Sequence, residues 1–277
     1  MTANPQAPDP RTPPQIDTSV SHSARVWNYW LGGNDHYPVD RQVGDRILAF
    51  VPELVRSARA DRSFLARAVR FLTAQGIRQF LDIGTGLPTV DNTHEVAQRL
   101  APESRIVYVD NDPLVLVHAR ALLTSTPEGA CDYIDADVHN PEAILRQAAR
   151  TLDFSQPVAI MMLGVLNFVI DHDQAVQVVR RLVDATVPGS YLVVSHPTTE
   201  VDAVPMTEAV RYWNQQGSAQ MTLRTRDELL RFFDGLELLE PGVVTCSRWR
   251  PDATEISEII DVTQFGGMAR KTGQVTV

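Results

Sequence analysis

The sequence has few of the residues that would hold a disulfide, a metal ion or a nucleic acid. Its two cysteines, Cys131 and Cys246, are isolated in separate predicted strands, so we expect buried thiols and no disulfide. The seven histidines show no H-x-x-x-H spacing and no C-x-x-C pair is present, so no metal site is predicted. The formal net charge of −9 gives no global basic field for nucleic-acid phosphates. A nucleic acid is therefore not the expected partner.

Long hydrophobic runs are also missing. The longest apolar stretch, residues 158–170, is too short to cross a bilayer and is typical of a buried strand with its exit loop. The first fourteen residues contain five prolines and no apolar segment, which fits neither a signal peptide nor a membrane anchor. We therefore expect a disordered tail over residues 1–22 and a cytoplasmic protein without a membrane partner.

What the sequence does contain is a regular alternation of strand and helix patterns over residues 77–277. Five strand patterns are followed by helices, and two more strands are expected near the end, at 78–83, 105–110, 131–136, 158–163, 191–196, 236–244 and 258–265. Such alternation implies a mostly parallel sheet with helices on both faces and ligands at the carboxyl ends of the strands. The predicted fold is α/β with a seven-stranded sheet.

Helical patterns precede the first strand. The first begins at Ser23, places Ala24, Trp27 and Leu31 on one face, and ends at Gly32-Gly33. A second begins at Pro38, and a third covers residues 53–75. We expect residues 23–76 to form a helical cap that is one structural unit with the sheet.

The segment LDIGTGLP (81–88) places a carboxylate two residues before a glycine turn. Asp82 would repel a pyrophosphate, and Thr89 stands where a dinucleotide fingerprint has its third glycine. S-adenosylmethionine has no phosphate and carries an ammonium and a sulfonium, so this acid favours it. Gly84 and Gly86, on either side of Thr85, would let the backbone approach such a ligand. An ordinary turn with a solvated aspartate is the alternative.

Polar or small residues also end the next three strand patterns. Asp110, followed by Asn111, stands where nucleoside-binding sheets hold a ribose diol, although it could equally cap the next helix. After the third strand, the carboxylate of Asp135 or Asp137 could accept a hydrogen bond from an adenine amino group. The predicted cofactor-binding residues at this edge are Asp82, Gly84, Thr85, Gly86, Asp110, Asn111, Asp137, Val138, Leu163 and Gly164.

Five segments carry a resemblance to a known family: ARVWNYWLGGNDHYPVDR (24–41), FLARAVRFL (64–72), QFLDIGTGLPT (79–89), VYVDNDP (107–113) and FGGMARK (265–271). The chain resembles the actinobacterial S-adenosylmethionine-dependent methyltransferases long catalogued as a domain of unknown function. The resemblance implies a Rossmann-like class I methyltransferase fold, S-adenosylmethionine as cofactor and S-adenosylhomocysteine as product. The family usually has Tyr-Asp-Tyr-Leu at 27–30 and Lys-Asp-Asn-Phe at 34–37, where this chain differs.

The resemblance is dense in residues 23–40, which we expect to fold over the cofactor. The polar residues predicted to bind it there are Arg25, Tyr29, Gly33 and Asn34. If the acceptor is a hydroxyl or a protonated amine, a general base is useful. Three residues are candidates for that catalytic role by expected placement: His36, Tyr37 and His196.

The sequence thus predicts an enzyme that transfers a methyl group from S-adenosylmethionine to a small-molecule acceptor. Positioning the two reactants can supply much of the acceleration of such a displacement, so a dedicated base is not required. Two alternatives remain open. One is a non-catalytic protein that binds S-adenosylmethionine in a regulatory role, and the other is an NAD-dependent oxidoreductase.

Overall fold

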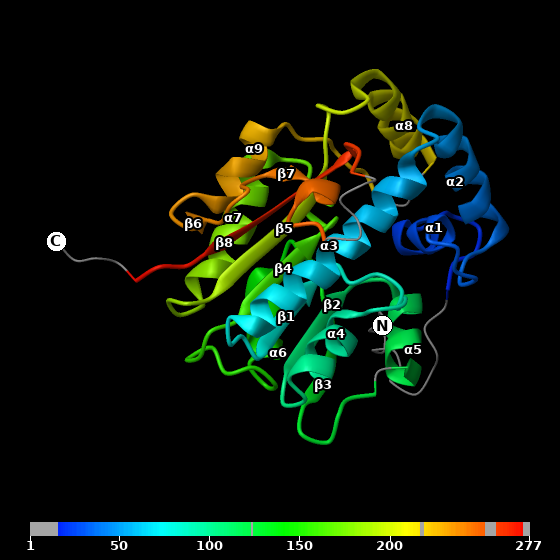
Figure 1. Ribbon diagram of the computed structural model, residues 1–277. Coiled ribbons are helices and arrows are strands. Elements are labelled where there is room, and N and C mark those ends of the chain that lie inside the picture. The colour runs from blue at the N-terminus through cyan, green and yellow to red at the C-terminus, as the bar shows by residue number, and fades with distance from the viewer. Residues whose placement is uncertain (1–15, 123, 217–218, 253–258, 274–277) are drawn as a thin grey trace, which may run out of the picture.

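The structure is a computed structural model that describes residues 16–122, 124–216, 219–252 and 259–273. A twisted sheet crosses the molecule, with helices on both faces (Figure 1). Five strands are parallel to their neighbours: β1 (Gln79–Ile83), β2 (Arg105–Asp110), β3 (Ala130–Asp135), β4 (Ala159–Leu163) and β5 (Tyr191–Pro197). They lie in the order β3-β2-β1-β4-β5, so the predicted α/β architecture is confirmed.

The antiparallel end of the sheet differs from the prediction of seven strands. Strand β8 (Gln264–Arg270) pairs with β5 on one side and with two short strands, β6 (Glu237–Leu238) and β7 (Val244–Thr245), on the other. The turn at Pro241-Gly242 interrupts what would be one closing strand, so the sheet has eight strands in seven positions.

The last strand was predicted at residues 258–265, but β8 begins only at Gln264. Residue 258 lies outside the described part of the chain. The sequence FGGMAR gave a weak strand signal because glycine has low strand propensity. Neighbouring side chains leave little room for a Cβ at either glycine. A Cβ at Gly266 would lie 3.0 Å from the Phe64 ring, and one at Gly267 would lie 3.1 Å from Val243.

Each face of the sheet has its own apolar core. On one face, α3 (Leu54–Ala74) and α4 (Thr93–Leu100) pack with the 3-10 helix η3 (Cys246–Arg248) around the buried Trp249. On the other face lie α6 (Pro141–Ala148), α7 (His172–Asp184), α9 (Arg226–Leu230) and η2 (Arg231–Phe233). Helix α5 (Pro113–Leu122) follows β2 and contacts β3. The carboxyl ends of the parallel strands stay uncovered by these layers.

A third apolar cluster lies beyond those strand ends. Helices α1 (Ser23–Trp30) and α2 (Pro38–Phe50) pack there with α8 (Ala203–Gln216), although α8 is about 150 residues away in the sequence (Figure 1). Val26, Ile47 and Trp213 are among its buried residues. The cap therefore includes α8, while α3, which we expected to belong to the cap, covers the sheet.

The described end of the expected tail makes specific contacts. The Ser21 hydroxyl donates to the carbonyl of Gln216 at the end of α8 (3.1 Å), and His22 is the N-cap residue of α1. Residues 1–15 lie outside the described part of the chain. Among the described residues, no helix combines the length and the hydrophobicity needed to span a membrane.

Candidate functional site

One cavity of about 460 Å³ opens at the carboxyl ends of β1, β2 and β4, beneath α1 and α8. All the residues predicted at the sheet edge lie in its wall, from Asp82 on β1 to Gly164 after β4. The topology explains this, because parallel strands end at the same edge and their following loops meet there. The remaining wall comes mainly from the cap helices and α3, with further residues from β5, β8 and the loops after β4 and α8.

The two glycines of the turn after β1 have different roles. Both have a positive φ, +78° at Gly84 and +67° at Gly86. A Cβ at Gly84 would lie 2.4 Å from the Cβ of Val165, so this glycine is required by packing between two loops. A Cβ at Gly86 would meet no atom within 4 Å. Gly86 is therefore where the backbone faces open space.

The Asp82 carboxylate is held at the base of the cavity. It is 4% exposed and accepts a hydrogen bond of 2.6 Å from the Thr93 hydroxyl. Burial raises the pKa of Asp82 to about 6, against the opposing effects of Thr93 and the Arg62 charge. A buried carboxylate with little neutralisation is an environment that favours a cationic ligand.

The Asp110 carboxylate joins the turn after β1 to the end of β2. It accepts hydrogen bonds from the backbone N–H groups of Gly86 (2.7 Å), Asn111 (2.9 Å) and Asp112 (3.0 Å). The residue that starts the next helix is Asp112, which accepts from the Leu114 N–H at 2.8 Å. Burial raises the pKa of Asp110. The capping alternative for Asp110 thus gives way to a role in shaping the cavity wall.

The loop after β3 contributes an exposed carboxylate and a buried apolar side chain. Asp137 accepts a hydrogen bond from the His139 N–H at 2.8 Å, and Val138 is 8% exposed within the core. Both line the cavity. Asp135, the other acid considered there, is exposed and does not line it.

The structure places four of the predicted cofactor residues away from the cavity: Arg25, Tyr29, Gly33 and Asn34. Helical periodicity is the reason, since the face of α1 that lines the cavity carries Ala24 and Trp27. The Tyr29 hydroxyl donates to Asp45 on α2, a Cβ at Gly33 would meet the Asn28 side chain, and Asn34 is exposed. Tyr29 and Gly33 therefore contribute to packing within the cap.

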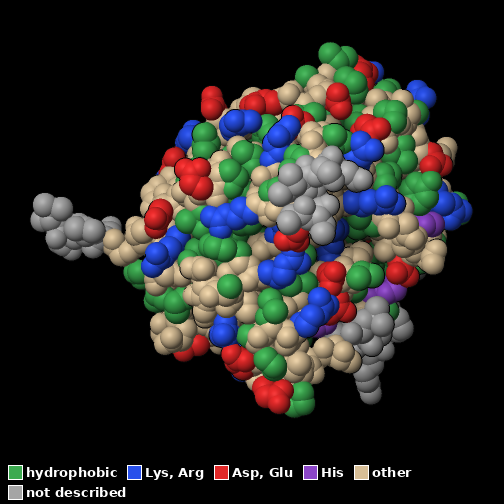
Figure 2. Space-filling model, viewed as in Figure 1, with side chains coloured by type: hydrophobic (Ala, Val, Ile, Leu, Met, Phe, Trp, Pro, Cys, Tyr) green, Lys and Arg blue, Asp and Glu red, His purple; other side chains and the backbone are tan. Residues whose placement is uncertain are grey.

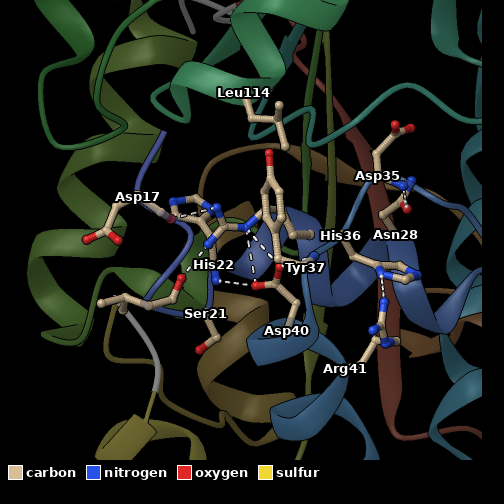
Figure 3. Close-up of polar contacts among 12 residues, drawn as sticks. Asp17, Ser21, His22, Asn28, Asp35, His36, Tyr37, Asp40, Arg41 and Leu114 are labelled. Atoms are coloured by element: carbon tan, nitrogen blue, oxygen red, sulfur yellow. Dashed lines mark hydrogen bonds and ion pairs between the residues drawn. The ribbon is translucent and has the colours of Figure 1, made fainter. Parts of the chain in front are cut away.

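The buried Arg25 is the centre of a clasp that we define as Asp17, Val20, Arg25 and Asp40. Figure 3 shows Asp17 and Asp40 on either side of it. Its guanidinium donates to Asp40 (3.2 Å) and to the carbonyls of Asp17 (3.0 Å) and Val20. Asp40 also accepts from the N–H groups of His22 and Tyr37. The clasp fixes α1, and with it the cavity-facing side chains, to the start of α2.

None of the three candidate bases lines the cavity. His36 contacts Arg41 and the Tyr29 ring, and Tyr37 packs in a small apolar cluster under Arg25 (Figure 3). His196 is fully buried, with its Nε2 2.7 Å from Nη1 of Arg224. Burial, followed by the Arg224 charge, lowers the pKa of His196 to about 3. A role as base is thus not supported by their positions.

The polar residues of the cavity wall that the sequence did not predict include Asp61, Arg62, Asn167 and Gln264. Asp61 gave a usable signal, because it interrupts the inward-facing row of Leu54, Ala58 and Leu65 on α3 with a charge. It is 5% exposed, and burial raises its pKa against hydrogen bonding from Ser195, Cys246 and Gln264. The described residues hold no group of three or more acids, histidines or cysteines suited to a metal.

Comparison with known proteins agrees with this geometry. Residues 9–272 match the model of a family described as S-adenosyl methyltransferase. The chain belongs to this S-adenosyl methyltransferase family. No curated protein matches the sequence.

Solved structures extend the comparison. A DUF574-family protein from Streptomyces avermitilis is 45% identical, with 93% of this chain and 100% of that one covered and a TM-score of 0.89. A candidate methyltransferase from Thermobifida fusca is 40% identical, with 96% and 100% covered and a TM-score of 0.84. Magnesium protoporphyrin IX methyltransferase from Synechocystis, solved with bound S-adenosylmethionine, is 11% identical over 89% and 90% of the chains, with a TM-score of 0.51. This last likeness concerns the class I methyltransferase fold alone.

Proposed function

We propose that the protein binds S-adenosylmethionine at the carboxyl ends of β1 to β4 and transfers its methyl group to a small molecule in the same cavity. The observation that carries this proposal is that an open glycine turn, the buried carboxylate of Asp82 and the half-buried carboxylate of Asp110 border one cavity. A nucleoside with a cationic tail and no phosphate matches this set of groups.

The residues present fit such a cofactor along its whole length. Asp110 would accept from the ribose hydroxyls, Asp137 from the adenine amino group, and Asp82 would lie nearest the ammonium. Val138 and Leu163 offer apolar contact for the adenine and the thioether region. These acids leave the methionine carboxylate as the group that still needs a partner.

Arg62 is suited to that carboxylate. It lines the cavity from α3, and its guanidinium donates to the backbone carbonyls of Val90 (3.2 Å) and Asp91 (3.1 Å). Backbone carbonyls do not neutralise its charge, so Arg62 retains a positive charge beside the acids of β1 and β2. A guanidinium held in this way can pair with a carboxylate.

When bound, S-adenosylmethionine supplies an electrophilic methyl group on a sulfonium. The protein's own residues would hold the donor and the acceptor in line and keep water out, which can account for about 7–11 kcal/mol of the barrier in favourable cases. The proposal retains the cytoplasmic location and the small-molecule partner expected from the sequence.

Calorimetric titration with S-adenosylmethionine, S-adenosylhomocysteine and NAD tests the binding step. We expect the first two to bind and NAD to give no heat, and a hundredfold excess over Kd should raise the free energy of unfolding by about 2.7 kcal/mol. Binding of NAD alone would indicate the oxidoreductase. Transfer of a labelled methyl group to a molecule of a fractionated actinobacterial lysate separates an enzyme from a regulatory binding protein.

A further inference from the structure

The cavity changes character as it extends from the sheet edge into the cap. Its far wall consists of large apolar side chains from α1, α8, the loop after α8 and the short helix η1 (Leu166–Phe168), which we call the tryptophan chamber: Trp27, Trp30, Phe168, Met206, Trp213 and Met221. None of these residues belongs to the predicted contacts of the cofactor. The chamber is continuous with the cofactor end, so both form one space.

Two of the three indole N–H groups of the chamber donate to backbone carbonyls of the protein. That of Trp213 donates to the carbonyl of Ala219 (2.7 Å), and that of Trp30 donates to the carbonyl of Gly44 (3.4 Å). Trp27 and Trp30 meet edge to face, with ring centroids 5.9 Å apart. The chamber therefore offers mainly ring faces, ring edges and thioethers, which favour an aromatic partner.

One polar atom in the wall lacks a partner. Asn167 is 4% exposed, and its side-chain oxygen has no hydrogen-bond partner among the described residues. A buried acceptor left unpaired is costly, so a ligand that donates a hydrogen bond would relieve it once the Asn167 side chain turns its oxygen toward the cavity. The occupant of the cavity should therefore carry an O–H or N–H group beside its apolar body.

Asp61 lines the cavity from α3, close enough to Asp82 for their charges to interact. The Gln264 side chain hydrogen bonds to Asp61 and is also the nearest group to Gly164 at the end of β4, at 3.7 Å from a Cβ built there. Asp61 thus lies near the end of β4, in the wall of the cavity that also contains the tryptophan chamber. Burial raises its pKa, which makes its carboxylate a stronger proton acceptor than an exposed one.

Resting on the proposed function, we propose that the methyl acceptor is a flat aromatic molecule whose ring occupies the tryptophan chamber and whose hydroxyl group faces Asp61 and Asn167. The hydroxyl oxygen attacks the methyl carbon, and the bond from that carbon to sulfur breaks with its electron pair staying on sulfur. The hydroxyl proton moves to the Asp61 carboxylate. The products are an aryl methyl ether and neutral S-adenosylhomocysteine.

A pair of matched ligands tests the chamber in the unaltered protein. Calorimetry with S-adenosylhomocysteine present should show 2-naphthol binding at least about tenfold more tightly than decahydro-2-naphthol, which has the same skeleton without aromatic rings. Equal binding of the two, binding of neither, or tighter binding of a saturated ammonium such as choline would overturn the proposal.

Single substitutions test which residues contact the aromatic ligand and whether Asp61 accepts its proton. Trp27→Leu should weaken 2-naphthol binding about tenfold, whereas Phe50→Leu, which changes an aromatic residue of the cap outside the cavity wall, should leave it unchanged.

Asp61→Asn should keep 2-naphthol binding within about threefold and lower formation of labelled 2-methoxynaphthalene at least about a hundredfold. Equal effects of Trp27→Leu and Phe50→Leu, or full methyl transfer by Asp61→Asn, would contradict the assignment.

The two proposals fail in different ways. If S-adenosylhomocysteine binds and 2-naphthol does not, the aromatic acceptor is wrong and the cofactor proposal stands. If 2-naphthol binds and neither S-adenosylmethionine nor S-adenosylhomocysteine does, the cofactor proposal is wrong whatever occupies the chamber.

Discussion

Asp82 and Asp110 end neighbouring strands, yet the fold uses their carboxylates differently. Asp110 accepts three backbone hydrogen bonds and shapes the turn, while Asp82 accepts one from a side chain and is left to act on its surroundings. The charged groups that act on Asp82 are Arg62, Asp110 and Asp61. Because fewer donors hold the Asp82 carboxylate, we expect a change in its protonation state to alter the affinity for a ligand more than the same change in Asp110.

We predict that the affinity for S-adenosylmethionine rises with pH between 5 and 7. The pKa of Asp82 is about 6, and only its ionised form attracts the ammonium of the ligand. About one-tenth of Asp82 is ionised at pH 5, so Kd should be up to about tenfold higher there than at pH 7. Calorimetry across this range measures the slope, and Asp82→Asn should flatten it. The same slope in parent and variant would assign the titration to Asp61 or Asp110.

Asp110→Asn should weaken S-adenosylmethionine binding by about 1.5–3 kcal/mol, because a charged acceptor for the ribose is lost. The amide oxygen can replace the carboxylate oxygen that accepts from Asn111 and Asp112, so we expect the fold to persist although the hydrogen bond from Gly86 is lost. Asp135→Asn is the matched control, since Asp135 is an exposed acid at the end of β3 that does not line the cavity. Calorimetry compares the three proteins, and equal affinities would leave Asp110 with only its structural role.

The site residues that could be predicted from the sequence are those whose positions follow from their immediate neighbours in the chain. A strand end and the loop after it lie together in the chain, so the acids and glycines of β1, β2 and β3 follow from the pattern. Gln264 and Asn167 could not be found in this way, because they reach the cavity through long-range packing of β8 and η1. Asp61 is an intermediate case. It was not predicted, although a charged residue on the apolar face of a helix can be recognised from the sequence alone.

Helix α1 is the element whose position depends most on specific polar contacts. Its apolar face meets the cavity, and the clasp holds the opposite side to α2. Sequence analysis predicted that the segment covers the cofactor, but its assignment of the polar residues assumed that they face the ligand. The apolar face was the better guide, because buried arginines commonly satisfy backbone carbonyls.

Arg25→Lys should loosen this segment without removing its charge. An ammonium cannot reproduce the fork that reaches Asp40 and the carbonyls of Asp17 and Val20, so the free energy of unfolding should fall by about 1–3 kcal/mol. Limited proteolysis should cut residues 17–40 faster, and S-adenosylmethionine should slow the cutting.

Tyr29→Phe is the control for the same helix. It removes only the hydrogen bond to Asp45, and we expect a change in unfolding free energy within about 0.5 kcal/mol and unchanged cofactor binding. If Arg25→Lys is cut no faster than Tyr29→Phe, the clasp does not control the segment. Weaker cofactor binding by Tyr29→Phe would instead favour the direct role first expected from the sequence.

At the scale of the whole molecule, charges of both signs are dispersed. On the face shown in Figure 2, basic and acidic side chains are interspersed, in keeping with the net charge of −9. We predict no tight binding of random RNA or DNA, because few counterions would be released. Fluorescence anisotropy at 50 and 200 mM salt measures this, and tight binding that falls steeply with salt would reveal a basic surface acting on phosphates.

The position of β8 has a consequence for how the protein is made. Among the described residues this strand comes last in sequence, yet it lies inside the sheet, with β5 on one side and the short strands β6 and β7 on the other. While the ribosome is still adding the preceding residues, the edge of β5 has no antiparallel neighbour, and an unpaired edge invites association with other chains. The nascent chain therefore passes through a period when five parallel strands are complete and the sheet is still open. That period closes only when Gln264 to Arg270 emerge, and the same event delivers Gln264 to the cavity.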